Sequence, residues 1–214
     1  MPITCDRLII EPGETVRIQA DWDEFNRILE ELGDRRASRI AYANGLLSIM
    51  VPLPEHEGAK ENLGDFIKVL LEELEMDRYA LGSTTFINTE TLKGVEPDNC
   101  FYIRNPSAVR GKYRLDLAVD PPPDLVLEID ITSRSHPEIY AALGVSELWQ
   151  YSRKGLEIKH LDPTNGTYQV KPESQYFPGL PLTEVLPQYL KRAATENINV
   201  VIKEFRAWIR GRIN

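Results

Sequence analysis

Two acidic residues interrupt the most strand-like segment of the sequence. Residues 125–131 read LVLEIDI, and the alternation of a strand places Glu128 and Asp130 on one face, opposite the leucines and isoleucines. Two carboxylates on one face of a central strand repel each other and resist burial, unless a cation or a basic side chain compensates them. The pattern therefore predicts either a cation site or an internal ion pair at this strand.

Asp98 is a third candidate for the same chemistry. It follows Pro97 directly and precedes another strand-like segment, residues 99–103. If the two strands are neighbours, Asp98 meets Glu128 across the sheet. Mg²⁺ and Mn²⁺ are held by such carboxylate pairs, with waters and a substrate phosphate completing the octahedron. The ion then lowers the pKa of a bound water that attacks phosphorus. An aspartate after proline is also a common turn residue, so that interpretation stays open.

The elements that position these acids succeed one another between residues 55 and 151. Helical periodicity comes first, then three strand-like segments, then a short helix and a further strand. This order predicts an α/β (α+β) fold with a mixed central sheet flanked by helices. An N-terminal helix and hairpin precede this core, and two helices follow it. The expected segments are 21–33 (helix), 38–42 and 46–51 (hairpin), 55–75 (helix), 84–88, 99–103 and 125–131 (strands), 136–144 (helix), 147–151 and 156–161 (hairpin), and 182–193 and 198–209 (helices).

Length and composition limit the class of protein. With 214 residues the chain can bury one sizeable core, so a single domain over 1–214 is expected, with its core at about 39–161 and a helical extension at about 182–214. No apolar run reaches the roughly 20 residues that cross a bilayer, and the start lacks a signal-peptide pattern, so a cytoplasmic protein is expected. The net charge of −8 argues against coating nucleic acid through the overall field. A local basic groove beside an acidic metal site is still compatible with it.

Three segments together resemble a bacterial family described as putative restriction endonucleases, within the PD-(D/E)XK nuclease superfamily. They are residues 94–98 (GVEPD), 123–130 (PDLVLEID) and 140–149 (YAALGVSELW). The resemblance spans about residues 39–161 and implies a restriction-endonuclease-like core in the order αβββαβ. It also implies Mg²⁺- or Mn²⁺-dependent hydrolysis of DNA, with Asp98 and Glu128 as catalytic, metal-binding residues and Asp130 as an additional ligand. A homodimer is expected by analogy, because duplex DNA presents two strands.

The sequence departs from the superfamily motif at its last position. That position normally holds a lysine, which orients the water and stabilises charge on the phosphate, whereas this chain has Asp130. Arg134, or Arg110 or Lys112 from the basic segment 104–120, are the candidate replacements, although the basic segment is equally well explained as a solvated loop. A member of the fold that binds DNA or protein without cutting is therefore the alternative function.

The first long helix offers two accessory candidates. Such folds often add an acid from this helix, and Glu61 or Glu57 could serve. His56 belongs to a segment that also looks like the family pattern, and it could donate to a phosphate or shuttle a proton. A half-buried residue at the helix start is the more common use of such a histidine.

Overall fold

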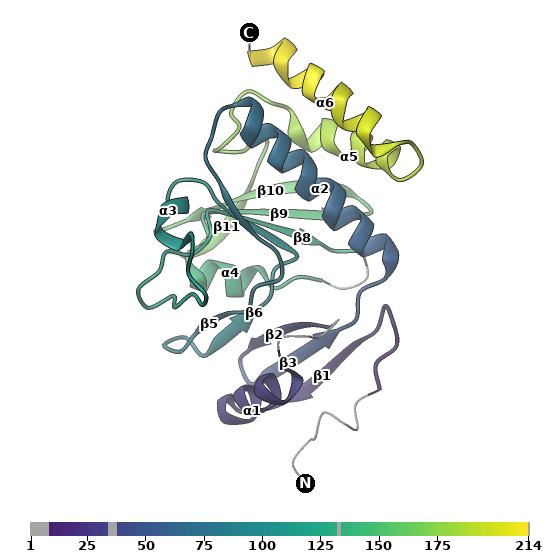
Figure 1. Ribbon diagram of the computed structural model, residues 1–214. Coiled ribbons are helices and arrows are strands. Elements are labelled where there is room, and N and C mark those ends of the chain that lie inside the picture. Colours follow the sequence, from purple (N-terminus) through teal and green to yellow (C-terminus); the bar gives the residue numbers. More distant parts are fainter. Residues whose placement is uncertain (1–8, 34–37, 132–133, 214) are drawn as a thin grey trace.

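The computed structural model describes residues 9–33, 38–131 and 134–213, which form two β-sheets and the helices that cover them (Figure 1). The six-stranded sheet has the order β11-β10-β9-β8-β7-β4, and the five-stranded sheet has the order β1-β3-β2-β6-β5. Within the described residues, no helix is long and apolar enough to cross a membrane. The strands are β1 (Thr15–Gln19), β2 (Arg39–Ala43), β3 (Leu46–Met50), β4 (Tyr79–Leu81), β5 (Phe86–Asn88), β6 (Lys93–Val95), β7 (Asn99–Tyr102), β8 (Leu125–Ile129), β9 (Glu147–Ser152), β10 (Gly155–Asp162) and β11 (Thr167–Lys171). The helices are α1 (Trp22–Leu32), α2 (Pro54–Glu73), α3 (Pro106–Val109), α4 (Pro137–Leu143), α5 (Leu182–Ala193) and α6 (Ile198–Ile213).

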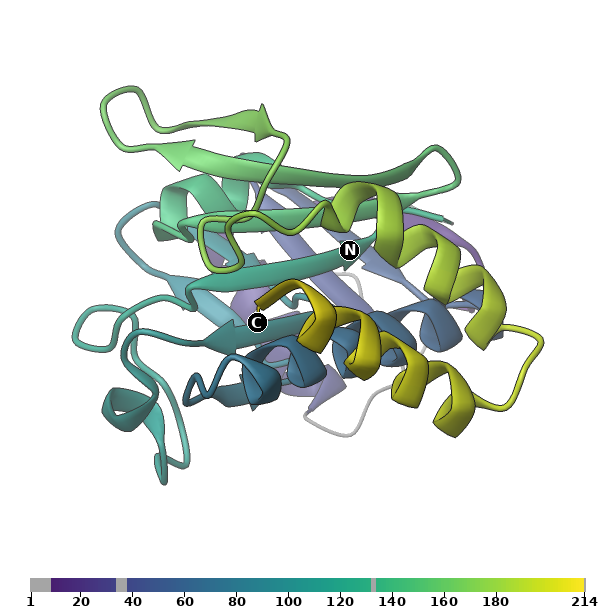
Figure 2. The same cartoon turned by 90° about the horizontal axis from the view of Figure 1, so that it is seen from above.

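The six-stranded sheet is mixed, as the sequence predicts. Strand β8 is antiparallel to β7 and parallel to β9, and α4 forms the crossover between β8 and β9. Leu125, Leu127 and Ile129 of β8 face a large apolar cluster with α2, α5 and α6, and Val126 faces a second cluster with α4. The helices α2 and α6 lie side by side over the first face (Figure 2). Burial of both faces explains why β8 is so hydrophobic.

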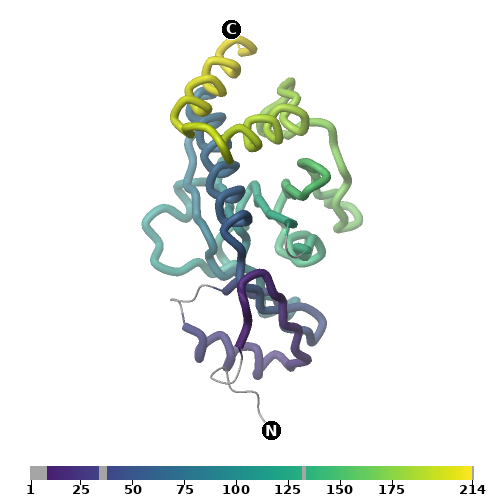
Figure 3. The backbone as a smooth tube through the Cα atoms, turned by 90° about the vertical axis from the view of Figure 1, so that its right-hand side faces the viewer, coloured from purple at the N-terminus to yellow at the C-terminus, as the bar shows by residue number. Residues whose placement is uncertain are grey.

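The five-stranded sheet is built around the predicted hairpin. Asn44 and Gly45 have φ angles of 53° and 75° between β2 and β3, as a tight hairpin turn requires. One face of the sheet packs against α1, whose N-cap residue is Asp21. Asp21 and Glu24 form a capping box, because Glu24 N donates to Asp21 Oδ1 at 2.8 Å and Asp21 N donates to Glu24 Oε2 at 3.1 Å. The N-terminal part of the chain is therefore a second layer rather than an appendage of the main sheet, and it lies at the opposite end of the molecule from α6 (Figure 3).

The assignment of residues 84–88 to the central sheet is wrong. Strand β5 belongs to the five-stranded sheet, and β4 occupies the edge position beside β7 instead. Strands β4 and β6 have three residues each, and such short segments carry no periodicity that a sequence pattern can detect. Sheet membership is decided by long-range pairing, which local patterns do not report.

Candidate active site between the two sheets

A cavity of about 460 Å³ lies where the two sheets face each other. The five-stranded sheet contributes one polar face to its wall, because Arg17 pairs in register with Ser48, and Arg39 with Met50. Residues alternate along these strands, so the other face keeps the apolar side chains that pack under α1. The opposite wall comes from β8, from the segment that follows it and from the start of α2.

Asp98 and Glu128 both line this cavity, although they lie 30 positions apart in the chain. Strands β7 and β8 are antiparallel neighbours with Asn99 opposite Leu127, which brings Asp98 beside the end of β8. The Oδ2 atom of Asp98 accepts a hydrogen bond from Ile129 N at 2.8 Å. The two carboxylic residues are only 3% and 9% exposed. The predicted meeting of these acids across the sheet is therefore what the structure shows.

Glu128 has a raised pKa, chiefly because it is buried and next because Asp98 places a second negative charge beside it. The Tyr140 hydroxyl donates to its Oε1 atom and partly opposes this rise. No ion pair links Glu128 to a basic side chain in the part of the chain that the structure describes. The interpretation in which Arg or Lys neutralises this strand inside the fold therefore has no support at Glu128.

Asp98 has basic neighbours on its other side. The His56 Nε2 atom lies 3.2 Å from Asp98 Oδ2, and Arg39 Nε lies 3.9 Å from Asp98 Oδ1. His56 is fully buried, and neither of its ring nitrogens has a hydrogen bond of good geometry to any described residue. The helix α2 thus brings a buried imidazole with free donor and acceptor capacity to the acidic pair. The more common use of such a histidine, as a half-buried residue at the helix start, therefore does not apply to His56.

Asp130 takes a different position from the other two acids. Its Oδ1 atom accepts from Ser135 N at 2.9 Å, and its Oδ2 atom accepts from Gln150 Nε2 at 3.1 Å. The Gln150 Oε1 atom in turn accepts from the ammonium of Lys159. Asp130 is absent from the cavity lining formed by the described residues. It ties the segment after β8 to the neighbouring strand β9, and this segment places Ser135 at the cavity wall.

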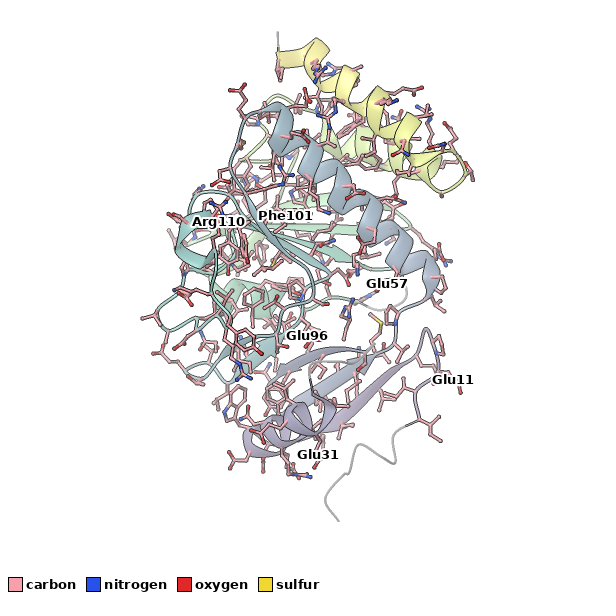
Figure 4. The ribbon with its side chains drawn as sticks, viewed as in Figure 1. Glu11, Glu31, Glu57, Glu96, Phe101 and Arg110 are labelled. Carbon is pink, nitrogen blue, oxygen red and sulfur yellow. The ribbon has the colours of Figure 1, made fainter. Side chains whose placement is uncertain are left out.

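The accessory candidates separate into two groups. Arg134 and His56 line the cavity with the acidic pair. Glu61 is exposed and lies 3.2 Å from Lys60 Nζ, whereas Arg110 lies 2.8 Å from Asp77 beside α3. Figure 4 shows Arg110 on the α3 side of the molecule, away from Glu57 at the start of α2. Lys112 forms an ion pair with Asp120 and lines a different, second cavity.

Three cavity residues were not singled out as site residues from the sequence. Arg17 and Arg39 lie on strands whose alternation is visible, but only the packing of one sheet against the other makes their face the wall of a site. Tyr140 is buried like a core residue, yet its hydroxyl contacts Glu128. A polar atom at the end of an otherwise apolar side chain is the one signal that pointed to such a contact.

The donor set suits a hard divalent cation. Mg²⁺ is usually bound by one or two carboxylates, with waters and substrate phosphates as its other ligands, and Asp98 and Glu128 supply that pair in a shared cavity. The described ranges contain no group of three or more His, Cys, Asp or Glu side chains close enough to hold a metal ion by themselves. Asp98 and Glu128 could thus supply two ligands to such a cation.

A mixed α/β protein with two sheets, flanking helices and a buried acidic pair is the class that these features define. Residues 22–195 match the family model Uma2, described as "Putative restriction endonuclease". The chain belongs to this family. A crystal structure of a putative nuclease belonging to DUF820 from Anabaena variabilis ATCC 29413 resembles it with a TM-score of 0.51 and 12% sequence identity, over 88% of this chain and 98% of that chain. A search of curated proteins finds no match.

Proposed function

We propose that this protein is a metal-dependent endonuclease that hydrolyses DNA phosphodiester bonds in the cavity between its two sheets. The observation that carries the proposal is the buried pair Asp98 and Glu128, which faces one cavity and in which Glu128 has no basic partner among the described residues. Membership of the Uma2 family supports it. The succession of α2, β7, β8, α4 and β9, with β8 antiparallel to β7 and parallel to β9, supports a restriction-endonuclease-like core.

Asp98 and Glu128 would hold Mg²⁺ or Mn²⁺, which when bound supplies positive charge at the phosphate and a water of lowered pKa. The protein's own contribution is to fix the two carboxylates. Ile129 N holds Asp98, and the Tyr140 hydroxyl holds Glu128, so each keeps one oxygen directed by a hydrogen bond. Such support of ligating carboxylates by further hydrogen bonds is a general feature of metal sites.

Arginines take the place of the missing lysine in this proposal. Arg39 and Arg134 line the same cavity as the acidic pair, and the guanidinium of arginine suits a phosphate because it donates in a fixed fork. Asp130 stands at the usual lysine position but is hydrogen-bonded to Ser135 and Gln150. Its role here is to hold the segment that carries Arg134, from outside the reacting groups.

Cleavage of circular DNA tests the proposal. Supercoiled plasmid and circular single-stranded DNA are incubated with Mg²⁺ or Mn²⁺ or with a chelator, and their nicking or linearisation is followed on gels. Asp98→Asn and Glu128→Gln should each lower the rate about 100-fold or more, because each removes charge from the site while keeping the shape of the side chain. Glu90→Gln is the matched control, since Glu90 is exposed in the turn between β5 and β6. Cleavage that persists in both variants, or in chelator, rules the proposal out.

One observation favours a second function, that of a fold member that binds without cutting. The described cavity lining contains no lysine, and Lys159 is engaged with Gln150 instead. Calorimetric binding of Mn²⁺ that depends on Glu128, together with the absence of cleavage of every DNA form, would select this function over the first.

A further inference from the structure

The cavity that holds the acidic pair is small. At about 460 Å³ it falls in the range of roughly 300–1,000 Å³ that encloses a small molecule, which suits a nucleotide but not a length of duplex. The two carboxylic residues are almost fully buried between walls that belong to different sheets. A phosphate of duplex DNA could enter only if the paired strand entered the same gap with it. A single strand can enter it alone.

A second cavity lies next to the first. It measures about 910 Å³, and Arg39 and Glu96 line both cavities, so these side chains stand between the two. Figure 4 shows Glu96 between the two sheets, between the α2 side and the α3 side of the molecule. The rest of the second cavity's lining is rich in uncharged polar groups, which can donate hydrogen bonds to sugars and bases or accept them. They are Asn26, Ser38, Ser83, Thr84, Thr85 and Thr89.

Tyr113 stands at the wall of this second cavity with 94% of its surface exposed. Its sequence neighbours Lys112 and Arg114 line the same cavity, together with the acids Glu30, Glu96 and Asp116. Two hydrogen bonds restrain the segment, because Asp120 accepts from Asp116 N at 2.9 Å and from the Lys112 ammonium. Proteins that bind single strands stack bases on such exposed rings.

Arg39 stands between the two cavities and lines both of them. Its Nε atom is buried and has no hydrogen-bond partner among the described residues, although the guanidinium lies near Glu57 and Asp98. The side chain as a whole is 15% exposed and lines both cavities, so its charge can attract a backbone phosphate next to the scissile one.

We propose that the substrate is single-stranded DNA, which places its scissile phosphate at Asp98 and Glu128 and runs past Arg39 into the second cavity, where Tyr113 stacks on an unpaired base. The inference rests on the proposed function for the site of cleavage, but its strand path rests on the second cavity. One strand needs one active site, so the homodimer expected by analogy with duplex cleavage is not required.

Binding without cleavage tests the strand path. A fluorescein-labelled 12-nucleotide strand and the matching duplex are titrated with the protein in EDTA, and anisotropy is recorded. We expect the strand to bind at least about 10-fold more tightly than the duplex, and Tyr113→Ala to weaken its binding about 5- to 100-fold, since stacking on one ring is lost. Tyr113→Phe keeps the ring and should bind within twofold of the wild type.

Val119→Ala is the matched control for an exposed side chain of the same segment, because Val119 is 81% exposed and lines neither cavity. Equal or tighter binding of the duplex overturns the inference, as does wild-type binding by Tyr113→Ala or the absence of binding to either DNA. Metal-dependent nicking of plasmid with no cleavage of the single-stranded circle overturns the inference and leaves the proposed nuclease standing. Strand binding that depends on Tyr113, without cleavage, supports the strand path and overturns the nuclease.

Discussion

Glu128 retains its proton to a higher pH in the folded protein than in the unfolded chain, because burial and then the charge of Asp98 raise its pKa. In the pH range between the ordinary value of 4.5 and the raised value, the folded state binds the proton and the unfolded state does not. The free energy of unfolding therefore falls as the pH rises through this range. Below pH 4.5 the group is protonated in both states and the difference vanishes.

Replacing Glu128 with glutamine should consequently stabilise the protein at neutral pH. Glu128→Gln keeps an oxygen that accepts from Tyr140 and does not titrate, so we expect the free energy of unfolding to rise by on the order of 1 kcal/mol at pH 8. The gain should shrink towards pH 4.5. Urea denaturation at several pH values measures it, with Glu90→Gln as the exposed control. A loss of stability at pH 8 would mean instead that the fold depends on a paired carboxylate at this position.

Asp130 can be distinguished from a metal ligand by its hydrogen bonds. Asp130→Ala removes acceptors from Ser135 N and Gln150 Nε2 and should lower the free energy of unfolding by about 1–3 kcal/mol. Asp130→Asn keeps one acceptor and should lose less. In calorimetry, Asp130→Asn should bind Mn²⁺ within a few-fold of the wild type, because this side chain lies outside the cavity lining. A loss of affinity as large as that of Glu128→Gln would identify Asp130 as a ligand.

The individual acids of the site could be predicted from the sequence, whereas the residues that contact them could not. The positions of Asp98 and Glu128 in strand-like segments predicted that they would meet if the two strands were neighbours. The partners Arg39 and His56 come from elements on either side of a gap, so their approach to Asp98 depends on how two layers pack. No local pattern encodes that distance.

At the scale of elements, β6 is joined to α1 by one close contact. A Cβ atom added to Gly94 would lie 2.8 Å from Phe25 Cζ, and the Phe25 ring is itself stacked on Tyr42 with 4.6 Å between ring centroids. Since Phe25 is fully buried and its ring is rigid, relief requires movement of α1 or of the sheet.

Gly94→Ala should therefore lower the free energy of unfolding by about 1–3 kcal/mol. Gly58→Ala is the control, because a Cβ there meets no described atom within 4 Å and alanine favours a helix by up to about 1 kcal/mol. Both values come from urea denaturation. Equal stability of the two variants would show that α1 can move to accommodate the added methyl group, and that the contact between Gly94 and Phe25 does not restrain β6.

Elements of strong periodicity were predictable and short ones were not. The hairpin at Asn44, the strand β8 and the helices α2, α5 and α6 each have a local signal that the structure confirms. The polar edge strand β11 was missed, and β5 was assigned to the wrong sheet. An edge strand has little to bury, so its sequence resembles a loop.

At the scale of the whole molecule, the net charge of −8 means that the proposed binding of DNA would depend on local cations. The described cations that line the two cavities are Arg17, Arg39, Lys112, Arg114 and Arg134, and Lys112 is already paired with Asp120. Three or four phosphate contacts with a single strand correspond to a slope of log affinity against log salt of about −2 to −3.

Anisotropy titrations of the labelled strand between 50 and 200 mM salt, roughly the range over which such slopes are taken, measure this quantity. Arg39→Gln should make the slope shallower by about 0.7, the contribution of one phosphate. A slope twice as steep as expected would show that other basic surfaces take part. An unchanged slope in Arg39→Gln would remove this residue from the strand path.

The chain passes between the two sheets three times, through α2, through residues 82–85 and through residues 96–98. The shortest of these crossings ends in Asp98, while Glu128 is fixed inside β8. A ligand that widens the gap must either bend this three-residue span or pull Asp98 away from Ile129 N. If the acidic pair hydrolyses DNA as proposed, a molecule that forces the two layers apart would separate Asp98 from its hydrogen-bond donor and stop the reaction. An inhibitor of this kind would not need to touch either carboxylate.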